Sequence, residues 1–495
     1  MLRRGGSVAD ASLATAAAQI VLTGGAHVSF AGFMTALYFQ KSSQTVFALD
    51  AGYNAPLEEL QPSTIPGLGT SSGRSVLVPG FWAGFQALHQ KFGRLPFFAT
   101  LEPALELAEQ GGPVGPLLAG PMNSQAGLLK AHPQMSHLLK ADGKPYQLGE
   151  RFRQPALAET LRKIAKNGTD EIYRGEWAHD FVQVVQQAGG RLSLEDLKRY
   201  TPVWSQPLIA NAGPYRLYGP GIGPGGMQTL LALKLLDQAG LSRYDESALA
   251  LDWLLKILRV SQAVASSPQS YGKAWGLDLS DPIGQSASLW QRMQAHDWKN
   301  HDLQLSGRTN RTPSHSAGIV AMDSSGDAVA LLHTINTYGW GSTGLCVGGI
   351  PVPDSGALQQ VQIAQAGPGG RILNTTNPLL AIEGERLALV CSAIGAAGFS
   401  VTVENVWLVI NQGLNPFEAA DAPKTWGTMA DQPDRQLLQG RFNPKLLSQL
   451  TELDIRWAPV PERNLSSAGH WVGLRHKQQL EGGGTSFLNG RFEGY

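Results

Sequence analysis

The segment from Ser316 to Asn336, SAGIVAMDSSGDAVALLHTIN, constrains the fold of this chain more than any other stretch. Residues 316–322 and 328–335 are mostly apolar and strand-like, and the DSSGD run between them has the composition of a tight turn. The pattern predicts a β-hairpin that closes on the pair Ser324 and Asp327.

The register of this hairpin decides which side chains lie beside its first residue. With the closing pair above, Ser316 faces Ile335, whereas a slip of one residue places Thr334 or Asn336 opposite. A hydroxyl and a carboxamide lie next to Ser316 in either case. Such an arrangement suits an enzyme whose nucleophile is the first residue of a strand, freed by self-cleavage. The alternative is a buried hairpin in which the Ser and Thr are incidental.

Composition limits the classes of function. Lys and Arg total 39 and so do Asp and Glu, so we expect no attraction to nucleic acid or to other polyanions. At 495 residues with 58 glycines and 16% charged residues, the chain resembles a densely packed, loop-rich enzyme of one large or two intimately packed domains. No apolar run approaches the ~20 residues that span a bilayer, so we expect no membrane span.

No motif predicts a metal or another cofactor. His296 and His301 lie in a polar stretch without an acidic or cysteine partner set. The loop GPGIGPGG at residues 219–226 lacks the Lys-Ser/Thr pair of a phosphate-binding loop. The two cysteines, Cys346 and Cys391, lie in apolar runs and are expected to be buried free thiols.

Helices alternate with strands on both sides of a polar stretch at residues 294–315. Helices are predicted over residues 8–22, 81–92, 101–110, 157–166, 176–188, 227–238 and 399–412, and strands near 33–39, 44–49, 378–382 and 386–392. Because helix and strand occur on both sides, we expect one α+β unit with a processed loop. Its two regions would be residues 1–315 and residues 316–495.

The first residues, MLRRGGSVADASLATAAAQIVLTGG, superficially suggest an export signal. Asp10 and Gln19 interrupt the apolar part, which favours a helix of the folded protein. As written, the chain is expected to be cytoplasmic; it would be periplasmic or secreted if its true N-terminus lies upstream.

A series of motifs, in a shared order, resembles the γ-glutamyltranspeptidase family of N-terminal-nucleophile hydrolases. RRGGSVADASLA is similar to that family's early GGNAVDAA helix, and HVSFAGF to a shortened form of its Gly-rich loop. VPGFWAGFQALHQKFGRLP, YGPGIGPGGMQTL, GDAVALLHTIN, NPFEAADAP and GGTSFLNGRFEGY follow in the expected order. The resemblance implies a four-layer αββα sandwich.

The resemblance also implies a nucleophile. In that family a precursor cuts itself before a Thr, whose hydroxyl then attacks an amide carbonyl while its own α-amine acts as base. Alignment without a gap places Ser316 at this position, with Ala317 and Gly318 in place of the following Thr and His. Ser314 is the alternative if the alignment contains a small insertion, because Ser314 and His315 keep a Thr-His-like pair.

Several supporting positions match the family. Thr334 aligns with the Thr that hydrogen-bonds the nucleophile, and Asn336 with an Asn that contacts the substrate amino group. Gly395 and Ala396 fall on the loop whose backbone amides form the oxyanion hole. Ala396 keeps the amide donor, provided that the backbone there does not require a positive φ.

Positions that recognise a glutamyl group differ. Gly52 stands where the family has the Arg that binds the α-carboxylate, and Tyr53 where it has a Glu. The acidic residue that anchors the substrate ammonium is missing, although Asp354 is nearby. Asn374 and Thr375 replace a Ser pair and still offer hydrogen bonds.

Two functions remain open. The first is a self-cleaving amide-bond hydrolase or acyltransferase of the glutathione-hydrolase type with altered acyl specificity. It would act on a small amide or peptide, and its two fragments would stay associated. The second is a catalytically inactive family member that serves as a binding or scaffold protein.

Overall fold

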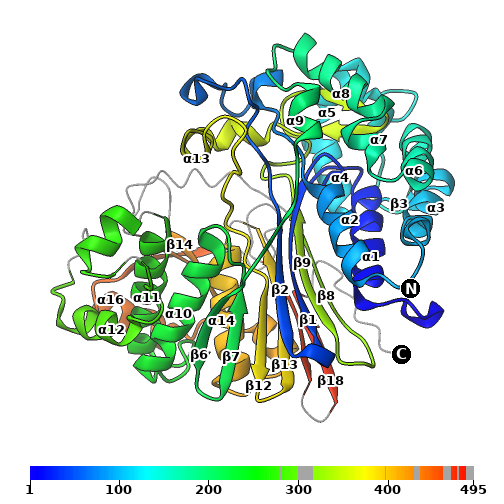
Figure 1. Cartoon of the computed structure of the whole chain (residues 1–495). Helices are drawn as coiled ribbons and strands as arrows, with labels where there is room; N and C mark the ends of the chain where they lie inside the picture. The colour runs from blue at the N-terminus through cyan, green and yellow to red at the C-terminus, as the bar shows by residue number, and fades with distance from the viewer. Residues whose placement is uncertain are drawn as a thin grey trace.

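Two β-sheets pack face to face, and helices cover their outer faces (Figure 1). The computed structural model describes residues 1–266, 268–278, 280–298, 316–395, 397–428, 435–460, 470–476 and 479–485. This arrangement is the α+β four-layer sandwich that the sequence predicts. Most of the predicted polar linker, residues 299–315, lies outside the described residues.

Both sheets are antiparallel and combine strands from the two sides of the linker. The first sheet has the order β5 (Val203–Ser205), β2 (Thr45–Ala51), β1 (Phe33–Gln40), β9 (Ala328–Thr334), β8 (Ser316–Met322). The second has the order β18 (Leu480–Gly484), β17 (His470–His476), β13 (Arg386–Ile394), β12 (Leu379–Glu383), β7 (Tyr215–Gly219), β6 (Leu208–Ala212).

One group of helices packs on the outer face of each sheet (Figure 1). The first sheet is contacted directly by α1 (Val8–Leu22) and α2 (Phe81–Phe92), and the hydrophobic core there also includes α3 (Glu102–Gln110), α6 (Pro155–Asn167) and α8 (Glu176–Gln187). The second sheet is contacted directly by α10 (Pro224–Ala239) and α14 (Gly398–Ile410), and the hydrophobic core there also includes α11 (Ala248–Ser266), α12 (Ser286–Ala295) and α16 (Pro444–Glu452).

Shorter elements complete the described chain. The remaining helices are α4 (Pro116–Ser124), α5 (Ala126–Ala131), α7 (Asp170–Tyr173), α9 (Leu194–Lys198), α13 (Gln360–Ala366) and α15 (Pro416–Asp421). The remaining strands are β3 (Gly112–Pro113), β4 (Arg151–Phe152), β10 (Leu345–Val347), β11 (Ile350–Val352), β14 (Lys424–Thr428), β15 (Arg435–Gln439) and β16 (Arg456–Val460).

Helix boundaries follow from local capping. Ser7 and Asp10 form a reciprocal capping box at the start of α1, which satisfies backbone donors that the first turn leaves free. Pro224 occupies the first turn of α10, where no backbone donor is needed. The predicted bounds 8–22 and 81–92 are both confirmed.

The central strands are buried on both faces, so their sequences are apolar throughout. In β1, Leu37 and Phe39 face the second sheet, and Met34 and Tyr38 face the helices. In β9, Ala328 and Ala330 face the second sheet. The even-numbered residues of β8 and β9 therefore point between the sheets.

None of the helices in the described ranges combines the length and apolar character needed to cross a bilayer.

Candidate active site

Ser316 is the first residue of β8, and its Oγ donates a hydrogen bond of 2.8 Å to Thr334 Oγ1. The two residues are direct partners in the β8–β9 ladder. Pairing of Ser316 with Ile335 is therefore wrong by one residue, and the alternative register with Thr334 opposite is confirmed. Ser316 is half-buried, whereas Thr334 is only 2% exposed.

The turn at the other end of the hairpin explains this register. The Asp323 N–H donates to the Asp327 carbonyl at 3.0 Å, and the Gly326 N–H donates to the Asp323 carbonyl at 3.0 Å. The loop thus has three residues between its closing pair, and Gly326 adopts a φ of 86° as such loops require. The sequence interpretation placed Ser324 in the closing pair and so predicted a shorter loop.

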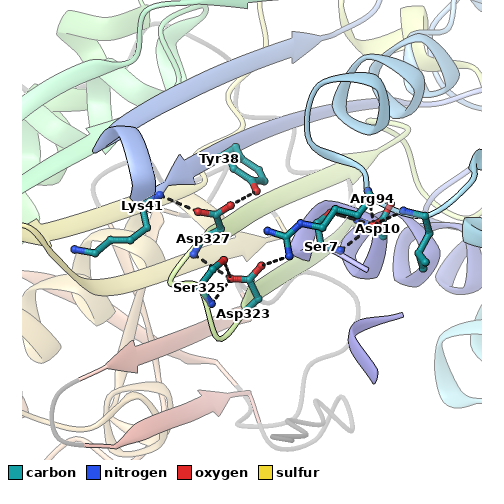
Figure 2. A network of polar contacts seen from close by, with 9 residues as sticks. Ser7, Asp10, Tyr38, Lys41, Arg94, Asp323, Ser325 and Asp327 are labelled. Atoms are coloured by element: carbon teal, nitrogen blue, oxygen red, sulfur yellow. Dashed lines mark hydrogen bonds and ion pairs between the residues drawn. The ribbon is translucent and has the colours of Figure 1, made fainter. Parts of the chain in front are cut away.

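Carboxylates fix this turn to its surroundings, as Figure 2 shows. Asp323 Oδ1 accepts hydrogen bonds from the backbone N–H groups of Ser325 (3.0 Å) and Asp327 (3.1 Å). Asp327 in turn accepts from Tyr38 Oη and from the Lys41 N–H, both at 2.8 Å. Burial, together with the hydrogen bond to Asp327, raises the pKa of Tyr38. The hairpin is therefore held to β1 and to the β1–β2 connection.

The same network reaches the first helix. Arg94 Nη1 lies 3.8 Å from Asp323 Oδ2, and the Arg94 N–H donates to Asp10 Oδ2 at 2.9 Å (Figure 2). Asp10 Oδ2 also accepts from the Ser7 N–H at 2.8 Å. The end of the hairpin opposite Ser316 is thus tied to the N-terminus of α1.

Gly318 lets the two sheets approach closely beside Ser316. A Cβ at Gly318 would lie 2.9 Å from Ser392 Oγ and 3.5 Å from Ile394 Cγ2, both on β13. Ser392 is fully buried and its hydroxyl donates to the Leu331 carbonyl at 3.3 Å. Ser392 therefore fills the space that a side chain at Gly318 would need.

Asn336 is the second residue after β9 and has a φ of 53°, which is uncommon for a residue with a side chain. Its N–H donates to Thr334 Oγ1 at 3.2 Å. Thr334 Oγ1 is thus the common acceptor for Ser316 and Asn336. The structure brings together these three residues that the sequence singles out.

The loop after β13 lies near the same end of the sheets, because Ile394 faces Gly318 across the inter-sheet space. Gly395 follows Ile394 and has a φ of 89°, a conformation that favours glycine. The Gly398 N–H donates to the Gly395 carbonyl at 3.0 Å, which leads the chain into α14. Ala396 lies outside the described residues, as do Ser314 and His315.

Gly52 and Tyr53 follow β2, two strands away from Thr334 in the first sheet. Phe33 pairs with Thr334, and Met34 pairs with Ala51, so Gly52 lies at the level of Phe33. The Tyr53 side chain is 2% exposed and its Oη donates to the Ala31 carbonyl at 3.2 Å. Burial raises the pKa of Tyr53. The Tyr53 side chain is therefore packed inside the protein, with its hydroxyl bonded to the backbone.

Asn374 lies against Gly52, whereas Thr375 is exposed. A Cβ at Gly52 would lie 3.1 Å from Asn374 Nδ2. Asn374 Oδ1 accepts from the Thr376 N–H at 3.1 Å, and Thr376 Oγ1 donates to Thr35 Oγ1 of β1 at 2.9 Å. These contacts fix the segment of Asn374 on the first sheet.

Sequence reasoning missed three residues beside the site: Asp50, Arg371 and Ser392. Arg371 and Asp50 form an ion pair (Nη1 to Oδ2, 2.8 Å) beside Gly52. They lie 321 positions apart, so no local pattern connects them. The one feature of the sequence that could have pointed to Arg371 is its place directly after the Gly-rich run AGPGG. Within the described ranges, no group of three or more His, Cys, Asp or Glu side chains is arranged to hold a metal ion.

Comparison with known proteins gives one family. A model described as Gamma-glutamyltranspeptidase matches residues 1–486. Scoloptoxin SSD14 of Scolopendra dehaani is 28% identical over 93% of this chain and 84% of its own length. The glutathione hydrolase proenzyme of Escherichia coli (strain K12) is 26% identical over 91% and 82%. The acylase ACY 1 proenzyme of Pseudomonas sp. (strain SE83) is 27% identical over 71% and 64%.

A solved structure shares the fold. Cephalosporin acylase from Bacillus halodurans superposes with a TM-score of 0.81 over 100% of this chain and 93% of its own, at 22% identity. At this level of identity the likeness concerns the arrangement of the sheets and helices. It confirms the four-layer fold.

Proposed function

This chain belongs to the γ-glutamyltranspeptidase family, and we propose that it is an amide-bond hydrolase or acyltransferase that cleaves itself before Ser316 and has an altered acyl specificity. The observation that carries the proposal is the hydrogen bond from Ser316 Oγ to Thr334 Oγ1, at the first residue of β8, whose even-numbered residues point between the two sheets. This bond restricts the rotation of the Ser316 side chain, which lacks the methyl group that limits χ1 in a Thr nucleophile.

Self-cleavage would proceed in two steps. Ser316 Oγ attacks the carbonyl carbon of residue 315, the peptide C–N bond breaks, and the acyl group moves to Oγ while the nitrogen of Ser316 takes the proton. Water then hydrolyses the ester, which leaves a carboxylate on residue 315 and a free α-amine on Ser316. The products would be residues 1–315 and 316–495.

These two fragments would stay associated. The first sheet pairs β1 of the large fragment with β9 of the small one, and the second sheet pairs β7 with β12 in the same way. Separation would expose the apolar surface between the sheets and break both ladders. Cleavage would therefore create a new C-terminus at residue 315 and a new N-terminus at Ser316, and the two fragments would remain folded together.

The new α-amine would then serve as the base in turnover. It takes the proton from Ser316 Oγ, which attacks the substrate carbonyl, and the ammonium so formed returns the proton to the nitrogen of the leaving amine as the C–N bond breaks. The acyl group of the resulting ester then passes to water or to an acceptor amine. Backbone N–H groups of the loop that begins at Gly395 would stabilise the oxyanion. Thr334 would orient the nucleophile, and Asn336 and Asn374 would contact the substrate.

Acyl specificity would differ because Gly52 replaces the arginine of the glutamyl-binding family members. An arginine there would form a bidentate pair with a carboxylate, and glycine offers no charge. The named acylase relative fits this proposal, since it shares the family but is named for acyl removal. We expect a small amide or peptide with a different acyl group.

A second candidate function is a binding or scaffold protein without catalysis. It is favoured by Ala317 and Gly318, which replace two residues of the family's nucleophile motif. Ser392 packs against Gly318, so the lack of a side chain at Gly318 is explained by packing. The presence of glycine there is therefore compatible with an active Ser316.

Hydrolysis of a panel of acyl p-nitroanilides by the purified protein tests the proposal. Turnover of at least one neutral acyl anilide is expected, together with loss of that turnover in Ser316→Ala. If no anilide is hydrolysed faster than by Ser316→Ala, the scaffold function stands instead. Retained hydrolysis of γ-glutamyl anilide alone would contradict the altered specificity.

A further inference from the structure

The peptide group between Ile335 and Asn336, just after β9, is held at both of its ends. Its carbonyl oxygen accepts a hydrogen bond of 2.6 Å from Ser355 Oγ, and its N–H donates to Thr334 Oγ1 at 3.2 Å. The carbonyl and the N–H of a trans peptide lie in one plane and point in opposite directions. Ser355 therefore lies on one side of this peptide, and Thr334 Oγ1 lies on the other.

Ser355 is itself fixed in place. It begins the short 3₁₀ helix Ser355–Leu358 and is only 1% exposed. The side-chain amide of Gln359 donates to the Ser355 carbonyl at 2.7 Å. On the other side, the buried Tyr53 Oη lies 2.9 Å from Ser355 Oγ. The hydroxyl group that holds the Ile335 carbonyl is thus supported by two neighbouring side chains.

The backbone at this peptide has an uncommon conformation. Asn336 has a φ of 53°, and residues with a side chain rarely keep a positive φ unless the surrounding structure holds them there. Rotation of the Ile335–Asn336 peptide would relieve this φ and would turn the Asn336 N–H away from Thr334. The Ser355 hydrogen bond opposes the rotation, because Ile335 is fully buried and its carbonyl would lose its partner.

The Asn336 N–H and the Ser316 hydroxyl donate to the same oxygen. Ser316 Oγ lies 2.8 Å from Thr334 Oγ1, and a hydroxyl oxygen has two lone pairs to offer. When both lone pairs accept a hydrogen bond, Thr334 Oγ1 stays an acceptor toward Ser316. Loss of the Asn336 N–H would let the Thr334 hydroxyl turn, and the Ser316 hydroxyl would lose its single direction.

We infer that Ser355 is a positioning residue for the nucleophile. It holds the Ile335–Asn336 peptide in the orientation in which the Asn336 N–H bonds Thr334 Oγ1, the acceptor of the Ser316 hydroxyl. The inference rests on the proposed function of Ser316. Ser355 acts on Ser316 through this peptide and through Thr334.

The rate of self-cleavage tests the inference, because this reaction is intramolecular and requires no bound substrate. Denaturing mass spectrometry measures it as the loss of the 495-residue chain over time. Ser355→Ala is expected to slow self-cleavage about fivefold to tenfold, which is the effect of one lost hydrogen bond. In a Thr334→Val background, the same change is expected to alter the rate by less than about twofold, because the acceptor through which Ser355 acts is absent.

Ser75→Ala is the matched control. Ser75 is also fully buried, it lies beside Gly356 of the same 3₁₀ helix, and its hydroxyl donates to a backbone carbonyl, that of Ser72, at 2.9 Å. This variant is expected to cleave itself at the wild-type rate. Amide hydrogen exchange at Asn336 is expected to accelerate in Ser355→Ala and to stay unchanged in Ser75→Ala.

Ser355→Cys covers the case in which Ser355→Ala does not fold. Cysteine keeps nearly the shape of serine, but its thiol is a weak donor, so slower self-cleavage is again expected. Wild-type cleavage rates in the folded variants, or equal slowing in the Thr334 and Thr334→Val backgrounds, would overturn the inference while leaving the proposed function intact. A wild-type chain that does not cleave itself at all would instead overturn both.

Discussion

Ser392 Oγ lies only 2.9 Å from where a Cβ of Gly318 would be, so the absence of a side chain at Gly318 and the presence of Ser392 belong together. The two residues lie on facing sheets, two positions along β8 from the candidate nucleophile. The space beside the backbone of Gly318 is occupied by Ser392 of the opposite sheet.

Gly318→Ala tests this relationship. The added methyl group at the half-buried Gly318 would collide with the fully buried Ser392, and overpacking of this kind destabilises a protein by about 1–3 kcal/mol. Ser392→Gly in the same chain is expected to recover part of the loss, so the two effects should not add. Urea unfolding of the three variants measures this. Additive losses would show that the two residues do not share the space.

Thr334→Val tests the acceptor of the Ser316 hydrogen bond. Valine keeps the shape and the β-branch of Thr334 but removes Oγ1, which accepts from both Ser316 and Asn336. Self-cleavage is expected to slow by about ten- to hundredfold, since one lost hydrogen bond corresponds to ~1.4–2.7 kcal/mol of barrier. Thr334→Ser is the control and should remain close to wild type. Equal cleavage rates for the two variants, followed by mass spectrometry over time, would contradict the role.

Asp323→Ala tests the origin of the hairpin register. The carboxylate accepts hydrogen bonds from the backbone of Ser325 and Asp327, so its loss is expected to destabilise the fold by about 1–3 kcal/mol. Amide hydrogen exchange at Asp327 should accelerate in the variant. Ser324→Ala, at an exposed position of the same turn, is the control. Unchanged exchange at Asp327 would show that the backbone alone sets the register.

His333→Gln tests an effect of pH on stability. Burial lowers the pKa of His333 from 6.5 to about 3. Its Nε2 lies 2.9 Å from Gln19 Oε1, so the ring donates there and stays neutral. Below pH 6.5 the unfolded chain takes up a proton that the folded chain refuses, so stability falls by up to about 1.4 kcal/mol per pH unit as the pH drops toward 3.

In the His333→Gln variant, the part of the fall in unfolding free energy below pH 6.5 that is due to His333 should disappear. The His179→Gln variant, changed on the exposed face of α8, should keep it. Urea unfolding midpoints between pH 4 and pH 7 measure the difference. Parallel pH profiles for wild type and His333→Gln would contradict a buried neutral histidine.

The parts of the fold that local chemistry determines could be predicted from the sequence. The bounds of α1 follow from the capping box of Ser7 and Asp10, and the two-strand pattern of the hairpin from its apolar runs. The register could not, because it depends on whether Asp323 or Ser324 closes the turn with Asp327. The 19-residue helix α11 is not predicted either, since its sequence is apolar around much of its surface.

In the candidate site, too, the sequence predicts the contacts between residues that are near in the chain but not those between distant residues. Ser316, Thr334 and Asn336 lie within 21 residues of sequence, and their proximity follows once the hairpin is recognised. The ion pair beside Gly52 joins Asp50 and Arg371, which lie 321 positions apart in the sequence. Charge pairing across such a separation leaves no periodic pattern in the sequence.

The mass of the purified wild-type chain tests the central claim most directly. Self-cleavage before Ser316 predicts two species on denaturing mass spectrometry, residues 1–315 and residues 316–495, the second with 495 − 315 = 180 residues. Ser316→Ala should remain one chain, whereas Ser316→Thr and Ser314→Ala should still be cut. A wild-type chain that stays whole at 495 residues after prolonged incubation, or one cut before Ser314, would contradict the account.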